Sequence, residues 1–198
     1  MKSGLIVVVV LVVIALIFGF QLMGTRNELV QEREAITGAW SQVDVVLQRR
    51  ADLIPNLVAT VQGYAAQERD VLIGVTNARA KATSVNVSAE AISDPAAMQK
   101  FQQAQAELSG ALGRLLVVAE NYPQLKSDQN FIRLQDELAN TENKIAQERR
   151  KYNQTVQKYN TDIELFPKNI AASMFGFQRN DAYFKAEGAA KTPPKVKF

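Results

Sequence analysis

The stretch that decides the fold is Gly4 to Met23, GLIVVVVLVVIALIFGFQLM, close to the start of the chain. Gln21 is its one strongly polar residue. A helix of about 20 residues measures roughly 30 Å, which is the thickness of the hydrocarbon core of a bilayer. An exposed strand cannot satisfy its backbone polar groups in lipid, so the stretch predicts a transmembrane helix.

A cleaved signal peptide is the alternative interpretation of this stretch. Its apolar region would normally span only about 7–15 residues before an A-x-A-like cleavage site. The residues after Phe20 read QLMGTRNELV, which contains no such site. We therefore favour a retained anchor. Lys2 on one side and Arg26 and Arg33 on the other give only a slight bias in orientation.

The amino-acid composition argues against several classes of protein function. The chain has 198 residues, a formal net charge of +3, no cysteine and no histidine. The basic residues are interspersed with acidic ones, which argues against a nucleic-acid surface. The lack of cysteine excludes a disulfide framework, and the lack of histidine removes the commonest general base and metal ligand.

Beyond the anchor, apolar residues recur at steps of three and four, and this periodicity predicts helices. Asp94-Pro95 and Ser127 or Asp128 are typical helix starts, while Pro123 and Pro167 end the helices before them. The segment 51–57, ADLIPNL, predicts a kink or a tight junction between helices, because Asp52 can cap a new helix and Pro55 is tolerated in a first turn but not in a helix interior. The predicted helices cover residues 27–50, 57–78, 95–122 and 128–166, with a short amphipathic piece at 170–175.

These patterns predict an all-α protein, in which an N-terminal transmembrane helix is followed by an antiparallel bundle of three to four long helices. Only Gly24 separates the anchor from the first bundle helix, so the two are expected to form one rod. The predicted division is an anchor at 1–25, a helical bundle at 26–177 and an irregular tail at 178–198, whose Val196 and Phe198 could still dock.

No catalytic motif is present. The sequence lacks a G-x-S-x-G elbow, a phosphate-binding glycine loop and an S-x-x-K arrangement. Carboxylates at helical spacing, such as Glu28 with Glu32 and Glu137 with Glu142, would need histidine partners to build a di-metal site. We expect solvated faces and ion pairs there, with no catalytic residue, metal or cofactor.

One polar cluster lies at the predicted junction. A structural interpretation makes Asp52 a helix cap that pairs with an arginine. The functional interpretation is a protein-docking surface, because arginine forks are favoured at interfaces. The candidate interaction residues are Asp44, Arg49, Arg50, Asp52, Pro55 and Asn56.

The chain resembles the LemA family of bacterial membrane-anchored helical proteins. The resemblance rests on AWSQVDVVLQRRADLIPNLVATVQGYAAQE (Ala39 to Glu68), VTNAR (Val75 to Arg79), ENYPQLKSDQNF (Glu120 to Phe131), ENKIAQERRKYN (Glu142 to Asn153) and FPKNIAASMFGF (Phe166 to Phe177). It implies a long-helix bundle behind one membrane segment and no catalytic residue or cofactor. Gln67 stands where the family motif often has histidine.

The resemblance also bears on place and partners. In some members of the family a lipoprotein signal replaces the spanning helix, so the resemblance implies an extracytoplasmic domain. Members are also often encoded near membrane metalloproteases. We therefore expect a non-enzymatic scaffold or adaptor of the bacterial cell envelope, as a homo-oligomer. The alternatives are a regulatory subunit of a membrane protease or sensor, a carboxylate-based hydrolase or metal enzyme, and a membrane-remodelling polymer.

Overall fold

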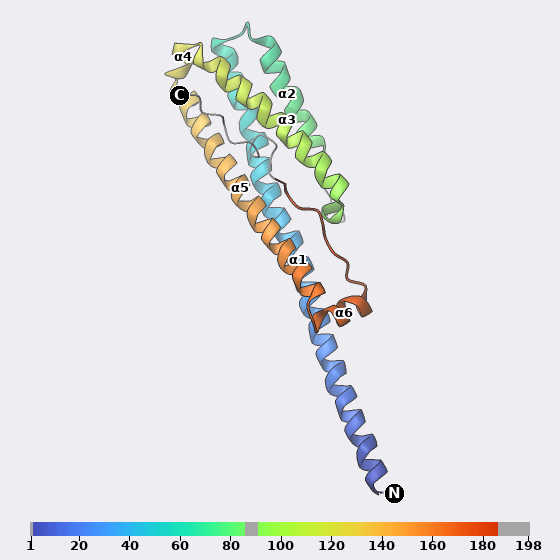
Figure 1. Ribbon diagram of the computed structural model, residues 1–198. Coiled ribbons are helices and arrows are strands. Elements are labelled where there is room, and N and C mark those ends of the chain that lie inside the picture. Colours follow the sequence, from blue (N-terminus) through green and yellow to red (C-terminus); the bar gives the residue numbers. More distant parts are fainter. Residues whose placement is uncertain (1, 86–90, 186–198) are drawn as a thin grey trace, which may run out of the picture.

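A single helix organises the structure. In the computed structural model, which describes residues 2–85 and 91–185, α1 (Lys2–Tyr64) is continuous over 63 residues. Its length is about 95 Å at ~1.5 Å per residue. Figure 1 shows its first part projecting alone from the bundle and its second part running through it. The predicted rod from anchor to bundle is confirmed.

The predicted junction at 51–57 is wrong, because α1 passes through Pro55 without interruption. A proline inside a helix lacks the N–H that would bind the carbonyl four residues earlier. Here that carbonyl belongs to Ala51, and Nε of Arg79 donates to it at 2.7 Å. The exposed Pro55 ring faces solvent. A side chain of the next helix thus replaces the missing bond.

The chain instead turns at residues 65–68, inside the helix predicted for 57–78. This turn separates α1 from α2 (Arg69–Ser84). Nε2 of Gln67 donates to the Tyr122 hydroxyl at 2.8 Å, and that hydroxyl donates to Oε1 of Glu68, also at 2.8 Å. The Tyr64 hydroxyl donates to Oδ2 of Asp128 at 2.9 Å. Contacts with distant residues therefore hold the turn.

The later helix boundaries agree with the predictions. After the short 3-10 helix η1 (Ala91–Ser93), Asp94 caps α3 (Pro95–Glu120) by accepting from the Ala96 N–H at 2.8 Å. α4 (Pro123–Lys126) is one turn long. Asp128 caps α5 (Gln129–Glu164), and α6 (Lys168–Phe175) ends at Gly176, whose φ of 71° favours glycine.

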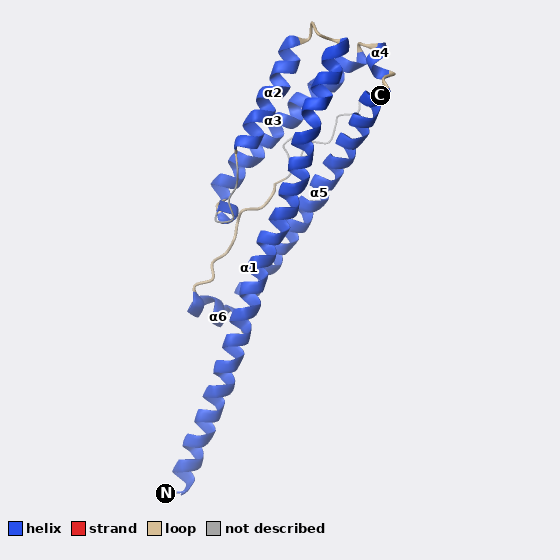
Figure 2. Cartoon of the chain, turned by 180° about the vertical axis from the view of Figure 1, so that it is seen from behind, coloured by secondary structure: helices blue, strands red, loops and turns tan. Residues whose placement is uncertain are grey.

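The helices pack as an antiparallel bundle, and the described residues contain no strand. α1 packs along α5, α2 packs along α3, and α1 also contacts α2 (Figure 2). The core near the middle of α1 contains Trp40, whose ring lies 5.2 Å from that of Phe101 and 5.8 Å from that of Tyr152. The predicted all-α bundle is confirmed.

An irregular segment, Phe177 to Lys185, returns along α5. Side chains of α5 bind its backbone: the Asn180 N–H donates to Oδ1 of Asn160 at 2.9 Å, and the Phe184 N–H donates to Oδ1 of Asn153 at 2.9 Å. Burial raises the pKa of Tyr152 to about 12, so its hydroxyl stays protonated, 3.1 Å from the Ala182 carbonyl oxygen. Val196 and Phe198 lie outside the described residues.

Candidate interaction site

One side of α1 stays exposed along the whole bundle. Residues on it recur at steps of three and four and span about 50 Å. We call this surface the outer face of α1. It consists of Gln31, Glu34, Gly38, Ser41, Gln42, Val45, Gln48, Arg49, Asp52, Pro55, Asn56, Ala59 and Gly63.

Four of the six predicted interaction residues lie on the outer face of α1. Arg49 extends toward α5, where its Nη2 lies 3.8 Å from Oε2 of Glu137. Asp52 accepts a hydrogen bond from Nε2 of Gln48 at 2.8 Å, one turn away, and neither caps a helix nor pairs with an arginine in this structure. Pro55 and Asn56 are exposed on the same face.

Asp44 lies at the edge of the outer face. It lines a small cavity of about 50 Å³ between α1 and α3, together with Phe101 and Gln105. Successive residues of a helix are about 100° apart, so Asp44 and Arg49 point in different directions. The structure thus brings together only part of the predicted cluster.

Arg50 is buried, and its placement differs from the prediction of an exposed docking residue. Its side chain is 1% exposed, and Nη1 donates to Oε1 of Glu142 at 2.9 Å and to Oγ of Ser109 at 3.3 Å. Nη2 donates to Oε1 of Gln105, whose Nε2 donates to the Ala82 carbonyl at 3.3 Å. This network joins α1, α3, α5 and the end of α2.

The sequence contained a signal for the burial of Arg50. Residues seven apart on a helix share a face, and Leu29, Ile36, Val43, Arg50 and Leu57 form one such series. All five are buried. The predicted break at residues 51–57 hid this register.

A charged cluster lies where α1 enters the bundle. Oxygen atoms of Glu28, Glu32 and Asp162 lie within 4.8 Å of one another, a grouping that can hold a metal ion. Lys168 donates to Asp162 at 2.8 Å and to Glu28 at 2.5 Å, and Lys158 donates to Glu32 and Asp162. Ammonium groups thus already compensate these carboxylates, and the cluster ties α1, α5 and α6 together.

The pKa values of Glu32 and Asp162 in this cluster are shifted in opposite directions. Burial and the neighbouring Asp162 raise the pKa of Glu32. A hydrogen bond with Glu32 and the two lysines hold the pKa of Asp162 well below its usual range. Although burial lowers it, hydrogen bonds to Asp162 and Glu28 give Lys168 a raised pKa. Sequence spacing paired Glu28 with Glu32 but could not show that Asp162 joins them.

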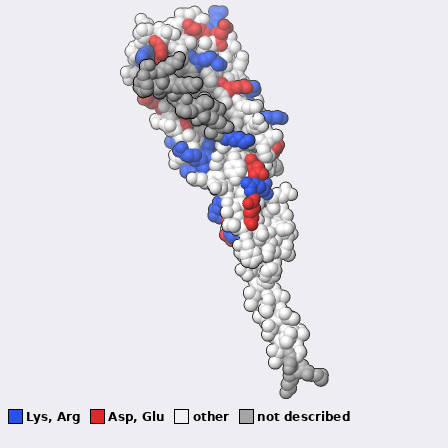
Figure 3. Space-filling model, in the orientation of Figure 1, with Lys and Arg blue, Asp and Glu red and all other residues white. Residues whose placement is uncertain are grey.

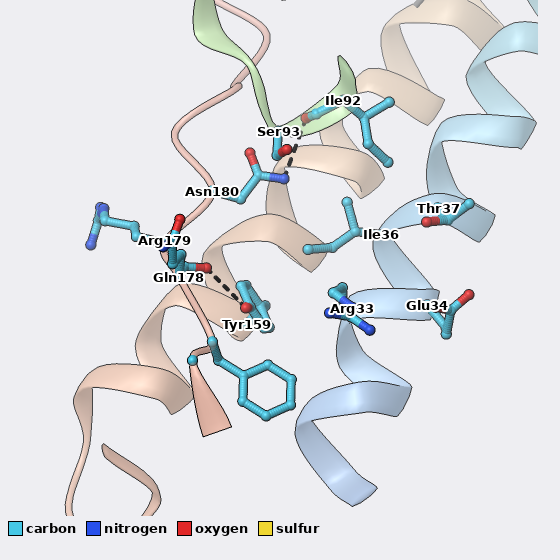
Figure 4. Close-up of a pocket in the computed structure, with 12 residues that line it drawn as sticks. Arg33, Glu34, Ile36, Thr37, Ile92, Ser93, Tyr159, Gln178, Arg179 and Asn180 are labelled. Atoms are coloured by element: carbon cyan, nitrogen blue, oxygen red, sulfur yellow. Dashed lines mark hydrogen bonds between the residues drawn. The ribbon is translucent and has the colours of Figure 1, made fainter. Parts of the chain in front are cut away.

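A cleft of about 670 Å³ lies between α1, α5 and the irregular segment. Figure 4 shows Arg33 and Thr37 on α1 facing Tyr159 on α5 and Gln178 on the segment. The Tyr159 hydroxyl donates to the Gln178 carbonyl at 2.9 Å. The Arg33 guanidinium carbon lies 5.8 Å from the centre of the Phe177 ring. These contacts hold the segment on the bundle.

Comparisons with known proteins give relatives over nearly the full length. Residues 39–198 match the LemA family. Magnetosome protein MamQ 2 of Paramagnetospirillum magneticum is 28% identical over 206 residues, covering 96% of this chain and 75% of that protein. Magnetosome protein MamQ of Magnetospirillum gryphiswaldense is 25% identical, covering 84% and 67%. Protein LemA of Metamycoplasma hominis is 24% identical, covering 65% and 55%.

The structure supports membrane association. Among the described residues, α1 is the one helix that is long and apolar enough to cross a membrane. Its apolar part is not buried by the bundle. Figure 3 shows that the described part of the tapering end carries no charged side chains on the visible face, whereas the bundle carries both signs. The chain is a membrane-associated protein with one candidate membrane span.

Proposed function

The chain belongs to the LemA family, and we propose that it is a non-enzymatic, membrane-anchored scaffold of the bacterial cell envelope that acts through protein–protein contacts. The observation that carries the proposal is the continuity of α1 from the membrane span to the far end of the bundle. Its residues after Met23 reach about 60 Å beyond the apolar segment. A helix without a hinge holds the outer face of α1 at a fixed height.

Two glycines favour the outer face of α1 as the contact surface. Glycine in a helix interior costs about 1 kcal/mol relative to alanine. Gly38 and Gly63 lie on this face, and a Cβ added to either would meet nothing within 4 Å. The packing of this chain therefore does not require glycine at either position, and the missing side chains leave room for a second helix to approach this face. Val45, between them, is 62% exposed.

The proposal extends to a homo-oligomer in which the outer faces of neighbouring copies meet. Arg49 and Asp52 lie one turn apart on this face and carry opposite charges. Residues of opposite charge on a self-complementary patch can pair across a two-fold axis. The exposed glycines let the two helices approach closely at the same place.

A pair of leucine substitutions tests the surface. Gly38→Leu places a bulky side chain on the outer face, and Gly113→Leu does the same at an exposed position of α3 that is equally free of contacts. Both variants should keep the helicity of the full-length protein in detergent. We expect Gly38→Leu to weaken self-association roughly tenfold, which corresponds to about 1.4 kcal/mol, and Gly113→Leu to leave it unchanged. Equal association of both variants would contradict the proposal.

Cross-linking identifies the partner on this surface. The chain has no native cysteine, so Val45→Cys introduces a single thiol. A homobifunctional maleimide applied to cells should give a band of twice the chain mass. A band of another mass, containing for example a membrane protease, would make the protein an adaptor instead of a homo-oligomeric scaffold. Absence of any cross-link would argue against the outer face as an interface.

We also propose that the bundle lies on the extracytoplasmic side of the cytoplasmic membrane. Val117 is 63% exposed on α3, well away from the span, so Val117→Cys reports on the side of the membrane. A membrane-impermeant maleimide should label this variant in spheroplasts without lysis. Labelling only after lysis would place the bundle in the cytoplasm.

A further inference from the structure

The segment from Leu165 to Phe175, which contains α6, carries an unusual distribution of apolar side chains. The helix buries its small residues Ala171 and Ala172 against the bundle. The large apolar residues around them point outward: Phe166 is 80% exposed, Met174 63%, Leu165 56% and Phe175 40%. A helix on a water-soluble bundle normally buries its large apolar residues. This arrangement therefore suits an apolar surrounding.

The position of α6 identifies that surrounding. It packs on α1 directly after the apolar segment that ends at Met23. At its C-terminal end, the Arg26 guanidinium carbon lies 5.7 Å from the centre of the Phe175 ring. At its N-terminal end, Lys168 donates to Oε1 of Glu28 at 2.5 Å. Both ends of the helix are thus fixed to α1 within about two turns of the membrane span.

The distance of α6 from the predicted membrane span places it at the level of the bilayer interface. If residues 4–23 fill the hydrocarbon core, Arg26 lies only about 5 Å above its edge at ~1.5 Å per residue. Interfacial helices lie with their apolar side chains about 5–10 Å into the boundary between headgroups and acyl chains. Figure 1 shows α6 running across α1 instead of along it, at the level where α1 leaves the bundle. A helix in that orientation lies in the plane of the membrane surface.

The charges at this level are compatible with a lipid surface. Arg26 is exposed, so its guanidinium can contact lipid phosphates while it also lies over the Phe175 ring. The ammonium group of Lys168 is held by Asp162 and Glu28, so no unpaired carboxylate is forced against the headgroups there. Basic residues with adjacent aromatic side chains are typical of membrane interfaces.

We propose that Leu165, Phe166, Met174 and Phe175 insert into the lipid interface of the membrane that α1 spans, forming a second membrane contact. The first contact, α1 alone, fixes the height of the bundle and leaves it free to tilt. A second contact beside α1 also fixes the direction in which the bundle leans. This inference requires the span to be inserted but does not depend on the partner of the outer face of α1.

Depth-dependent fluorescence quenching tests the proposal with the full-length protein in nanodiscs at one copy per disc. Met174→Cys and Val117→Cys are a matched pair, because both side chains are 63% exposed and the chain has no other cysteine. Each is labelled with an environment-sensitive fluorophore, and the discs contain lipids with a nitroxide at the headgroup or deep in the acyl chain. Phe166→Cys provides an independent second position.

The expected result is a blue-shifted emission at positions 174 and 166, with roughly half or more of the fluorescence lost to headgroup nitroxides and less to deep ones. The label at position 117 should show neither effect. Identical behaviour of the labels at 174 and 117 would overturn the proposal. A blue shift at 174 without quenching by either lipid would also overturn it, since protein and not lipid would then cover α6.

Discussion

Replacing Arg50 by alanine should destabilise the bundle strongly, although its neighbour Arg49 can be replaced at little cost. The Arg50 side chain is 1% exposed and binds Gln105, Ser109 and Glu142. Gln105 is itself buried. Loss of the guanidinium leaves the Gln105 amide oxygen without its partner, which costs about 1–3 kcal/mol.

The aliphatic stem adds a second contribution. Alanine keeps Cβ, so the substitution removes two methylene groups, Cγ and Cδ, and at ~0.8 kcal/mol each their lost burial costs about 1.6 kcal/mol. Glu142 is 40% exposed, so water can replace the arginine at that carboxylate, and we add nothing for it. The expected loss of unfolding free energy for Arg50→Ala is therefore about 3–5 kcal/mol. Arg50→Met keeps most of the stem and should lose only the first contribution, about 1–3 kcal/mol.

Arg49→Ala is the matched control. Its ion pair with Glu137 spans 3.8 Å and both side chains are about half exposed, at 55% and 51%. Such a surface pair contributes about 0–1 kcal/mol. The assay is urea unfolding of the full-length protein in mild detergent, followed by helical circular dichroism, with the midpoint and slope fitted for each variant. Equal midpoints for Arg50→Ala and Arg49→Ala would refute the reasoning.

The remaining predictions concern the helix cap, the charged cluster and the irregular segment. The N–H groups of α5 and the Tyr64 hydroxyl hold the pKa of Asp128 below its usual value of 3.8. The ionised Asp128 therefore stabilises the fold, and this contribution should fade as the pH drops below about 4. Asp128→Ala should remove this part of the acid dependence of the urea midpoint. The pKa of Glu32 is raised above its ordinary value of 4.5 in the folded protein, so ionisation of Glu32 at higher pH opposes folding. Glu32→Gln should therefore raise the urea midpoint at pH 7, and this gain should disappear below pH 4.5. Asp162→Asn weakens the ion pairs with Lys158 and Lys168 and should lower the urea midpoint at pH 7. Equal effects of Glu32→Gln and Asp162→Asn would contradict the opposite pKa shifts of the two carboxyl groups. The Phe184 ring stacks on that of Trp40, with 5.9 Å between the ring centres. Phe184→Ala should therefore lower the unfolding free energy by about 3–5 kcal/mol and increase hydrogen exchange in residues 177–185. Unchanged exchange would show that other contacts hold the segment.

Local signals in the sequence predicted much of this fold. Asp94 and Asp128 cap the helices that they were expected to start, and α5 ends before Pro167. Capping depends on side chains within three residues of the helix start, so a single sequence contains the information.

The errors arose where a distant contact decides the structure. Pro55 lies inside α1 because Arg79 binds the carbonyl that the proline leaves free. The turn at 65–68 depends on Tyr122, more than fifty positions away. Neither contact has a local signature in the sequence.

The candidate site was predictable only in part for the same reason. Arg49 and Arg50 are equivalent by residue type, and the register of a continuous α1 is what separates the exposed residue from the buried one. The interaction role of the predicted cluster and the division into anchor, bundle and tail remain predictions. The apolar surface of α6 was also missed, because the alternation within Lys168–Phe175 does not show which residues face the bundle.

The most direct test of the scaffold proposal is native mass spectrometry of the protein, extracted from its own membrane in mild detergent at its natural abundance. We expect a stoichiometric assembly that contains more than one copy of this chain and is weakened by Gly38→Leu. A monomer without any bound protein, unchanged by that substitution, would contradict it.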